Sequence, residues 1–161
     1  MIHLKVNTYI EIVELGRSGR VYFYTIRLND APHTEAEAFR MRFLDHPTFG
    51  SDYLEIANIL KQISRRGAQQ RYFRHERAAE ALPPKWVRNA RLRQYLLRLS
   101  DNVVILGNGC VKETRTAQES RDCNPKFQLM NKLSEKITHL CISGDLEITY
   151  TGLEGELEFY L

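Results

Sequence analysis

Arginines recur along residues 71–98, and aromatic side chains are interleaved with them. A guanidinium group binds phosphate through paired N–H donors, and an aromatic ring can stack on an unpaired base. The pattern therefore indicates contact with a nucleic acid. The candidate nucleic-acid-binding residues are Arg71, Arg77, Arg91, Tyr95, Arg98 and, beyond this segment, Thr114. The alternative is a sheet edge on which the arginines form surface ion pairs.

His75 lies between Arg74 and Glu76 in the same segment. Imidazole titrates near neutral pH, which suits a general acid or base for phosphodiester cleavage. Arg74 beside it would stabilise the extra negative charge of the transition state. The alternative is a solvated histidine without a chemical role, since a lone histidine in a charged loop is more often solvated than catalytic.

A second polar cluster follows the apolar residues 102–106. Gly107 and Gly109 flank Asn108, which predicts a positive-φ turn or a bulge, and cations and hydroxyls that suit a phosphate follow. The candidate catalytic residues are Arg74, His75, Arg93, Lys112 and Arg115. The alternative for this second cluster is a polar strand end. The P-loop order is absent, as are the motifs of metalloproteases, serine hydrolases and glycosidases, so we expect no metal and no cofactor.

The charge is unevenly distributed along the 161 residues, although the formal net charge is only +3. Residues 61–121 carry fourteen Lys and Arg against five Asp and Glu, whereas the segments 1–60 and 122–161 are acidic. This distribution is typical of a surface that meets a polyanion. The length predicts a single domain over 1–161, and the absence of a long apolar run or leader predicts a cytoplasmic protein without membrane contact. Three cysteines without CxxC spacing favour neither a disulfide framework nor a zinc site.

Four stretches predict strands. Residues 1–30 alternate β-branched and aromatic side chains around a "GRSG" turn, which predicts a hairpin. Residues 91–99 and 102–112 predict two further strands, the second apolar enough to be buried at the centre of a sheet. In the first of these, Leu92, Leu96 and Arg98 should share one face, and Arg93, Tyr95 and Leu97 the other. The acidic residues 145–161 predict a closing hairpin.

Three helices are predicted between these strands. The first begins after Thr34 as N-cap and the second runs from Ser51 to Gly67. The third begins at Asn124 or Pro125, ends at Gly144, and has one apolar face made by Phe127, Met130, Leu133, Ile137 and Leu140. Residues 69–89 predict a loop with some extended pieces, since Pro83 and Pro84 rule out a continuous helix. The expected fold is α+β with a small antiparallel or mixed sheet, helices packed on one side, and the order ββ-αα-ββ-α-ββ.

The order of these elements resembles a known family. Two helices end in "RRGA", a basic segment follows, and "RLRQYLLRL" then precedes an apolar strand that runs into "VKETRT" and a helix. This pattern resembles the RelE/HigB-like toxins of type II toxin–antitoxin systems, particularly the phage-derived branch, with the RelE-like core over residues 34–141. The resemblance implies a metal-independent mRNA endonuclease that makes the 2′-hydroxyl attack the adjacent phosphate. It also implies mRNA as partner, often on the ribosome, and a small DNA-binding antitoxin.

The terminal hairpins over 1–30 and 145–161 are additions to that pattern, and either could cover the basic face. Exposed edge strands would also allow a homodimer. A first alternative function is a non-catalytic nucleic-acid or protein-binding module of mobile-element origin. A second is an interaction protein whose basic surface meets an acidic partner.

Overall fold

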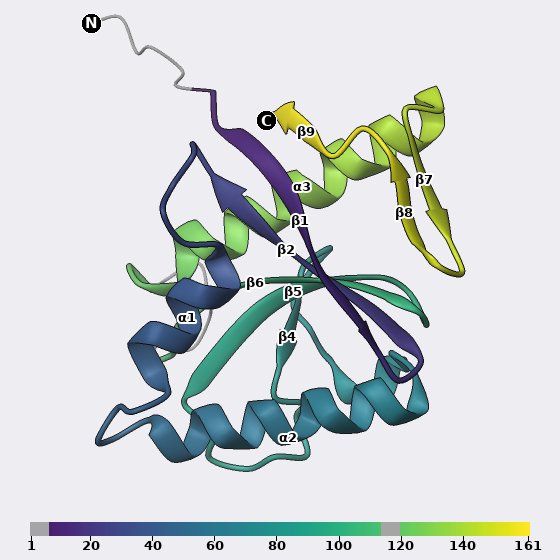
Figure 1. Ribbon diagram of the computed structural model, residues 1–161. Coiled ribbons are helices and arrows are strands. Elements are labelled where there is room, and N and C mark those ends of the chain that lie inside the picture. Colours follow the sequence, from purple (N-terminus) through teal and green to yellow (C-terminus); the bar gives the residue numbers. More distant parts are fainter. Residues whose placement is uncertain (1–6, 114–119) are drawn as a thin grey trace, which may run out of the picture.

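The computed structural model describes residues 7–113 and 120–161 (Figure 1). Within this part of the chain, helices and strands follow in the order β1 (Tyr9–Ser18), β2 (Val21–Leu28), α1 (Glu35–Phe43), α2 (Gly50–Arg66), β3 (Arg74–His75), β4 (Glu80–Leu82), β5 (Leu92–Ser100), β6 (Val103–Val111), α3 (Cys123–Ser143), β7 (Leu146–Thr149), β8 (Gly152–Gly155) and β9 (Glu158–Tyr160). A short 3-10 turn, Gln70–Tyr72, precedes β3. The expected α+β class is confirmed.

Seven strands form one mixed sheet in the order β3-β4-β5-β6-β2-β1-β9. All neighbours are antiparallel except β2 and β6, which run parallel with Tyr22 opposite Val103. The predicted N-terminal hairpin is present as β1 and β2, yet it is continuous with the sheet, because β2 pairs directly with the central strand β6. The predicted strands of residues 91–99 and 102–112 are also confirmed as β5 and β6.

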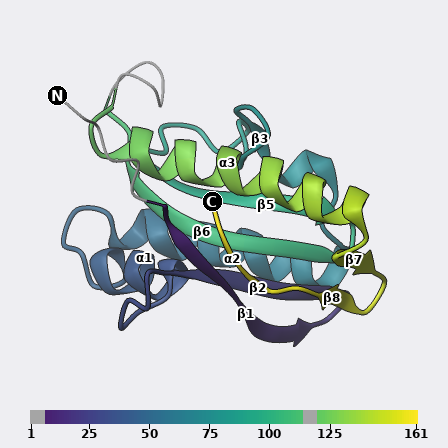
Figure 2. The ribbon, with the colours of Figure 1, turned by 90° about the horizontal axis from the view of Figure 1, so that it is seen from above.

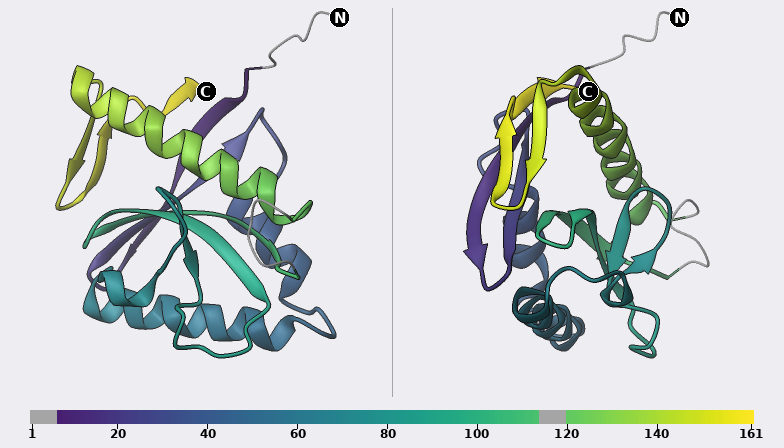
Figure 3. Two further views of the ribbon diagram at one scale, coloured as in Figure 1. Left: turned by 180° about the vertical axis from the view of Figure 1, so that it is seen from behind. Right: turned by 90° about the vertical axis from the view of Figure 1, so that its right-hand side faces the viewer.

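Helices cover both faces of the sheet, so the expectation that they pack on one side is wrong (Figures 1 and 2). One apolar cluster packs the face under α1 and α2, and a second packs the face under α3. Side chains of β5 point alternately to the two faces of the sheet and so enter both clusters. Leu92 and Leu96 belong to the cluster under α1 and α2, whereas Tyr95 and Leu97 belong to the cluster under α3. Figure 3 shows the sheet between α2 and α3 from two further sides.

The helices begin and end close to where sequence patterns predict. Thr34 caps α1, since its hydroxyl accepts a hydrogen bond from the Glu37 backbone N–H at 3.3 Å. The C-cap residue of α2 is Gly67 and that of α3 is Gly144, both with positive φ. The predicted apolar face of α3 is buried throughout, with Phe127, Met130, Leu133, Ile137 and Leu140 in the core.

The predicted element order needs two corrections. The segment 69–89 contributes two short strands, β3 and β4, which extend the sheet beyond β5. The acidic C-terminal segment contains three strands: β7 and β8 form a separate two-stranded hairpin, and β9 joins the main sheet beside β1. The chain therefore ends on the edge of the sheet opposite to β3.

Two glycines in β6 allow close packing. The ladder pairs Gln94 with Gly109 but Leu96 with Leu106, so β6 holds one extra residue and forms the predicted bulge. A Cβ on Gly109 would collide with the Arg93 carbonyl oxygen and the Phe39 ring. The glycines thus bring β5 and α1 close to β6, and neither adopts a positive φ.

Among the described residues, α3 and the other helices are too short or too polar to cross a bilayer.

Candidate phosphate-binding site

Three cations from different segments of the chain lie near one carboxylate at the β3 end of the sheet. Arg74 comes from β3, Arg93 from β5, and Lys112 directly follows β6. Lys112 Nζ lies 3.9 Å from Glu76 Oε1, and both side chains are largely buried, with 14% and 17% of their surface exposed. We call Arg74, Glu76, Arg93 and Lys112 the Glu76 cluster. It holds three positive charges against one negative charge.

Strand alternation places this cluster on the α3 side of the sheet. Arg93 shares a face of β5 with Tyr95 and Leu97, which belong to the core under α3. Phe73 points to the α2 side, so Arg74, its neighbour in the chain, points to the α3 side. Two strands thus direct their guanidinium groups to the same side.

Arg93 is the most buried member of the cluster, with 7% of its surface exposed. Its Nη1 donates to the carbonyl oxygens of Ala90 and Leu92 at 2.7 and 3.0 Å. Its Nε is fully buried and has no hydrogen-bond partner among residues 7–113 and 120–161. Burial, and then the charge of Arg74, lower the pKa of Arg93 to about 10, so the group stays charged at neutral pH. Arg93 therefore contributes a positive charge to the cluster, whereas its buried Nε–H is closed to a ligand.

Burial also lowers the pKa of Lys112 and the pKa of Arg74, while Glu76 opposes the shift in both. Burial therefore outweighs the Glu76 carboxylate in its effect on the pKa of both groups. Arg74 is held in place because its Nε donates to the Pro83 carbonyl oxygen at 3.2 Å. A half-buried, positively charged and fixed cluster has the properties of a phosphate site.

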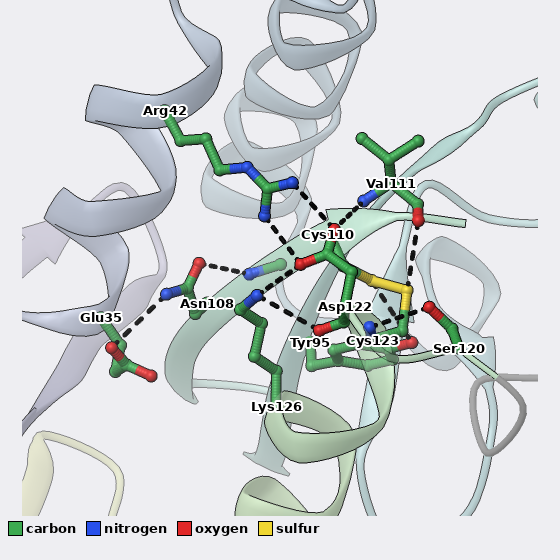
Figure 4. Close-up of polar contacts among 11 residues, drawn as sticks. Glu35, Arg42, Tyr95, Asn108, Cys110, Val111, Ser120, Asp122, Cys123 and Lys126 are labelled. Carbon is green, nitrogen blue, oxygen red and sulfur yellow. Dashed lines mark hydrogen bonds and ion pairs between the residues drawn. A yellow bond between two sulfur atoms is a disulfide. The ribbon is translucent and has the colours of Figure 1, made fainter. Parts of the chain in front are cut away.

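The backbone before Lys112 is anchored to the start of α3 (Figure 4). Cys110 in β6 forms a disulfide with Cys123, the first residue of α3. The expectation of unpaired cysteines is therefore wrong for these two, while Cys141 is free. The sequence did not indicate the pair because the contact depends on how α3 packs on β6.

Asp122 adds a second anchor beside the disulfide (Figure 4). Its carboxylate accepts two hydrogen bonds from Arg42 at 2.8 and 2.9 Å, one from Lys126 at 2.7 Å, and one from the Val111 backbone N–H at 2.9 Å. Burial acts to raise the pKa of Asp122, but these hydrogen bonds outweigh it and hold the pKa well below its usual range. The carboxylate thus ties α1, β6 and α3 together next to Lys112.

His75 points away from the Glu76 cluster. It alternates with Arg74 along β3, and its Nδ1 lies 2.9 Å from Glu80 Oε1 on the α2 side. Glu80 is buried, which raises its pKa, although the charges of His75 and Arg98 oppose the shift. The structure therefore does not bring His75 together with Arg74, Arg93 and Lys112. Arg98 itself is engaged by the Ala68 carbonyl oxygen and by Asp101.

The remaining predicted residues are dispersed. Tyr95 is fully buried and packs against Phe127, with ring centroids 5.6 Å apart, so its ring is not available for a base to stack on. Arg77 is exposed, Arg71 lies over the Tyr72 ring, and Arg91 pairs with Glu113 at 3.1 Å. Thr114 and Arg115 lie outside the described residues.

Sequence reasoning missed one residue that matters here, Glu76, and left undecided whether a second, Trp86, stacks on bases or fills the core. In the sequence Glu76 stands out only as a neighbour of His75, yet it is the carboxylate around which the cations gather. Trp86 is the exposed aromatic of the basic segment, with 58% of its surface exposed, whereas Tyr72, Phe73 and Tyr95 fill the core. The two prolines before Trp86 were a usable signal, because they end β4 and direct the chain to the surface.

Comparisons with known proteins add no assignment: no protein-family model, no curated protein and no solved structure matches the chain.

Proposed function

We propose that the protein is a metal-independent RNA endonuclease of the RelE/HigB toxin type and that the Glu76 cluster is its active site. The observation that carries the proposal is the excess of two positive charges in the partly buried Glu76 cluster. A phosphodiester would neutralise this excess.

The reaction needs only groups that the cluster contains. The Glu76 carboxylate takes the proton of the ribose 2′-hydroxyl, and the 2′-oxygen attacks the adjacent phosphorus. Arg74 and Arg93 stabilise the added negative charge of the transition state. The bond to the 5′-oxygen breaks, and Lys112 Nζ donates a proton to that leaving oxygen. The products are a 2′,3′-cyclic phosphate and a 5′-hydroxyl.

The ion pair, with Lys112 Nζ 3.9 Å from Glu76 Oε1, holds the proton donor and the proton acceptor of this scheme beside each other. The lowered pKa of Lys112 makes its ammonium a better proton donor. His75 has no step in this scheme, because its imidazole faces the other side of the sheet.

The test is cleavage of a labelled mRNA in EDTA, with and without ribosomes, by the wild type, Glu76→Gln and Lys112→Ala. Lys132→Ala and Glu135→Gln on the exposed side of α3 are matched controls. We expect cyclic phosphate ends from the wild type and both controls, and a loss of about 100-fold or more in each cluster variant, since general acid–base catalysis contributes that much. His75→Ala should retain activity.

RNA that stays intact both with and without ribosomes would overturn the proposal of a nuclease. If the protein still binds RNA, and Lys112→Ala weakens that binding, the chain is a non-catalytic nucleic-acid-binding module. In cells, induced expression of the wild type should arrest growth, and Glu76→Gln should not.

A further inference from the structure

A pocket of about 430 Å³ lies between the start of α2 and the segment that leads into β5. Its walls include Asp52 and Glu55 from α2, and Pro83, Trp86, Val87 and Arg88 from the facing segment. The Glu76 cluster lies on the other side of the sheet, so this pocket is a separate feature. It combines carboxylates, an aromatic ring and a cation.

The two carboxylates have free hydrogen-bonding capacity. They stand three residues apart on a helix and so share one side of it. Within residues 7–113 and 120–161, Asp52 accepts one long hydrogen bond, from the Arg91 backbone N–H at 3.4 Å. Among the described residues, Glu55 forms no ion pair, and its side chain is exposed. These oxygens can accept hydrogen bonds from a ligand.

Trp86 is oriented and accessible. Its Nε1 donates to the Arg71 carbonyl oxygen at 3.3 Å, which fixes the indole, while 58% of its surface stays exposed. An exposed indole beside cations is a stacking platform for an unpaired base. The nearby Lys85, Arg88 and Arg71 can meet the phosphates on either side of that base.

We propose that this pocket binds an unpaired guanine of the RNA. Guanine presents two adjacent N–H donors on its Watson–Crick edge, N1–H and N2–H, which match the two oxygens of one carboxylate. The other three bases present acceptors beside their donors on that edge, and a carboxylate repels those acceptors. The pocket volume accommodates a stacked purine. The inference rests on the proposed function for its ligand, since it assumes that the chain meets RNA.

The pocket and the Glu76 cluster are connected through Pro83. Pro83 lines the pocket, and its carbonyl oxygen accepts the hydrogen bond from Arg74. Asp52 is also close enough to raise the pKa of Arg93 against the effect of burial. A base held in the pocket therefore places a neighbouring phosphate near the edge of the sheet where the cluster lies.

The fluorescence of Trp86 tests the proposal directly, because it is the single tryptophan of the chain. GMP, AMP, CMP and UMP are titrated into the full-length protein, and quenching gives each dissociation constant. We expect GMP to bind roughly tenfold or more tightly than the other nucleotides, the discrimination that a bidentate contact provides. Asp52→Asn and Glu55→Gln, alone and combined, should reduce that preference to about twofold or less, whereas Glu135→Gln should retain it. The amide oxygen that Asp52→Asn introduces can still accept the hydrogen bond from the Arg91 backbone N–H, so folding is preserved.

Equal quenching by the four nucleotides, or none, would overturn the guanine pocket whether or not the protein cuts RNA. A guanine preference that the Asp52 and Glu55 variants leave unchanged would overturn it as well. A guanine preference in the titration, together with uncut RNA in the cleavage assay, would support the pocket and reject only the nuclease. Cleavage without a guanine preference would reject only the pocket.

Discussion

Replacing Glu76 by Gln separates the electrostatics of the cluster from its packing. The substitution retains the size of the side chain and removes its charge. Arg74, Arg93 and Lys112 then face one another without a carboxylate, in a place where burial already lowers the pKa of all three. The variant should be less stable, and it should bind anions more tightly.

The size of the effect follows from the geometry. At 3.9 Å, one pair of unit charges attracts by about 4 kcal/mol at an effective dielectric constant of about 20. Loss of one partner of a fully buried pair costs about 3–5 kcal/mol. Because 14–17% of these two side chains is exposed, we expect a smaller loss, about 2–3 kcal/mol of unfolding free energy at pH 7.

Urea unfolding of the wild type, Glu76→Gln and Glu135→Gln measures this difference. The experiment is repeated with phosphate and with sodium chloride at equal ionic strength. Phosphate should restore most of the lost stability of Glu76→Gln, because it replaces the missing carboxylate, and chloride should restore less. Glu135→Gln should stay within about 0.5 kcal/mol of the wild type under both conditions. A loss below about 0.5 kcal/mol in Glu76→Gln, or equal effects of the two salts, would refute the electrostatic account of the cluster.

Three further predictions concern single residues. Lys112→Ala should make the dependence of RNA affinity on salt less steep, by about 0.7 in the slope of log K against log salt, while Lys132→Ala leaves the slope unchanged. Gly109→Ala should destabilise the fold by about 3 kcal/mol in urea unfolding, because the added Cβ collides with the Arg93 carbonyl oxygen and the Phe39 ring. The control Gly144→Ala should cost about 1 kcal/mol, because only the φ of 82° disfavours a side chain there. Asp122→Asn should cost about 2 kcal/mol at pH 7. The folded-state pKa of Asp122 is lowered, so its contribution to stability is complete above the unfolded pKa of about 4 and declines as the pH falls below that value. The difference in unfolding free energy between wild type and Asp122→Asn should therefore become smaller at low pH. A difference that does not change with pH would contradict this role of the carboxylate.

Local signals predicted much of the fold. Thr34, the glycines at 67 and 144, and the apolar spacing of α3 determine where helices begin, end and face, because caps and amphipathic faces depend on neighbours in the chain. The helices on both faces were predictable in principle. Residues 92–97 carry large apolar side chains on both sides of the strand, which requires cover on both sides.

The site was harder to predict, because it depends on contacts between distant segments. The strands β3 and β4 have two and three residues, too few for a period to show. Their pairing nevertheless determines that Arg74 faces the α3 side and His75 the α2 side. Tyr95 and Trp86 are both aromatic residues among arginines, and composition does not distinguish the ring in the core from the ring at the surface. The cations of the cluster could be selected from the sequence, while the carboxylate between them could not.

The measurement that tests the central claim most directly is a crystal structure with a short single-stranded RNA whose 2′-hydroxyls are methylated, so that it cannot be cut. The account predicts a phosphate group among Arg74, Arg93 and Lys112, with one oxygen about 3 Å from Lys112 Nζ. An RNA bound only along Arg71, Lys85 and Arg88, with the Glu76 cluster unchanged and without a phosphate, would contradict it.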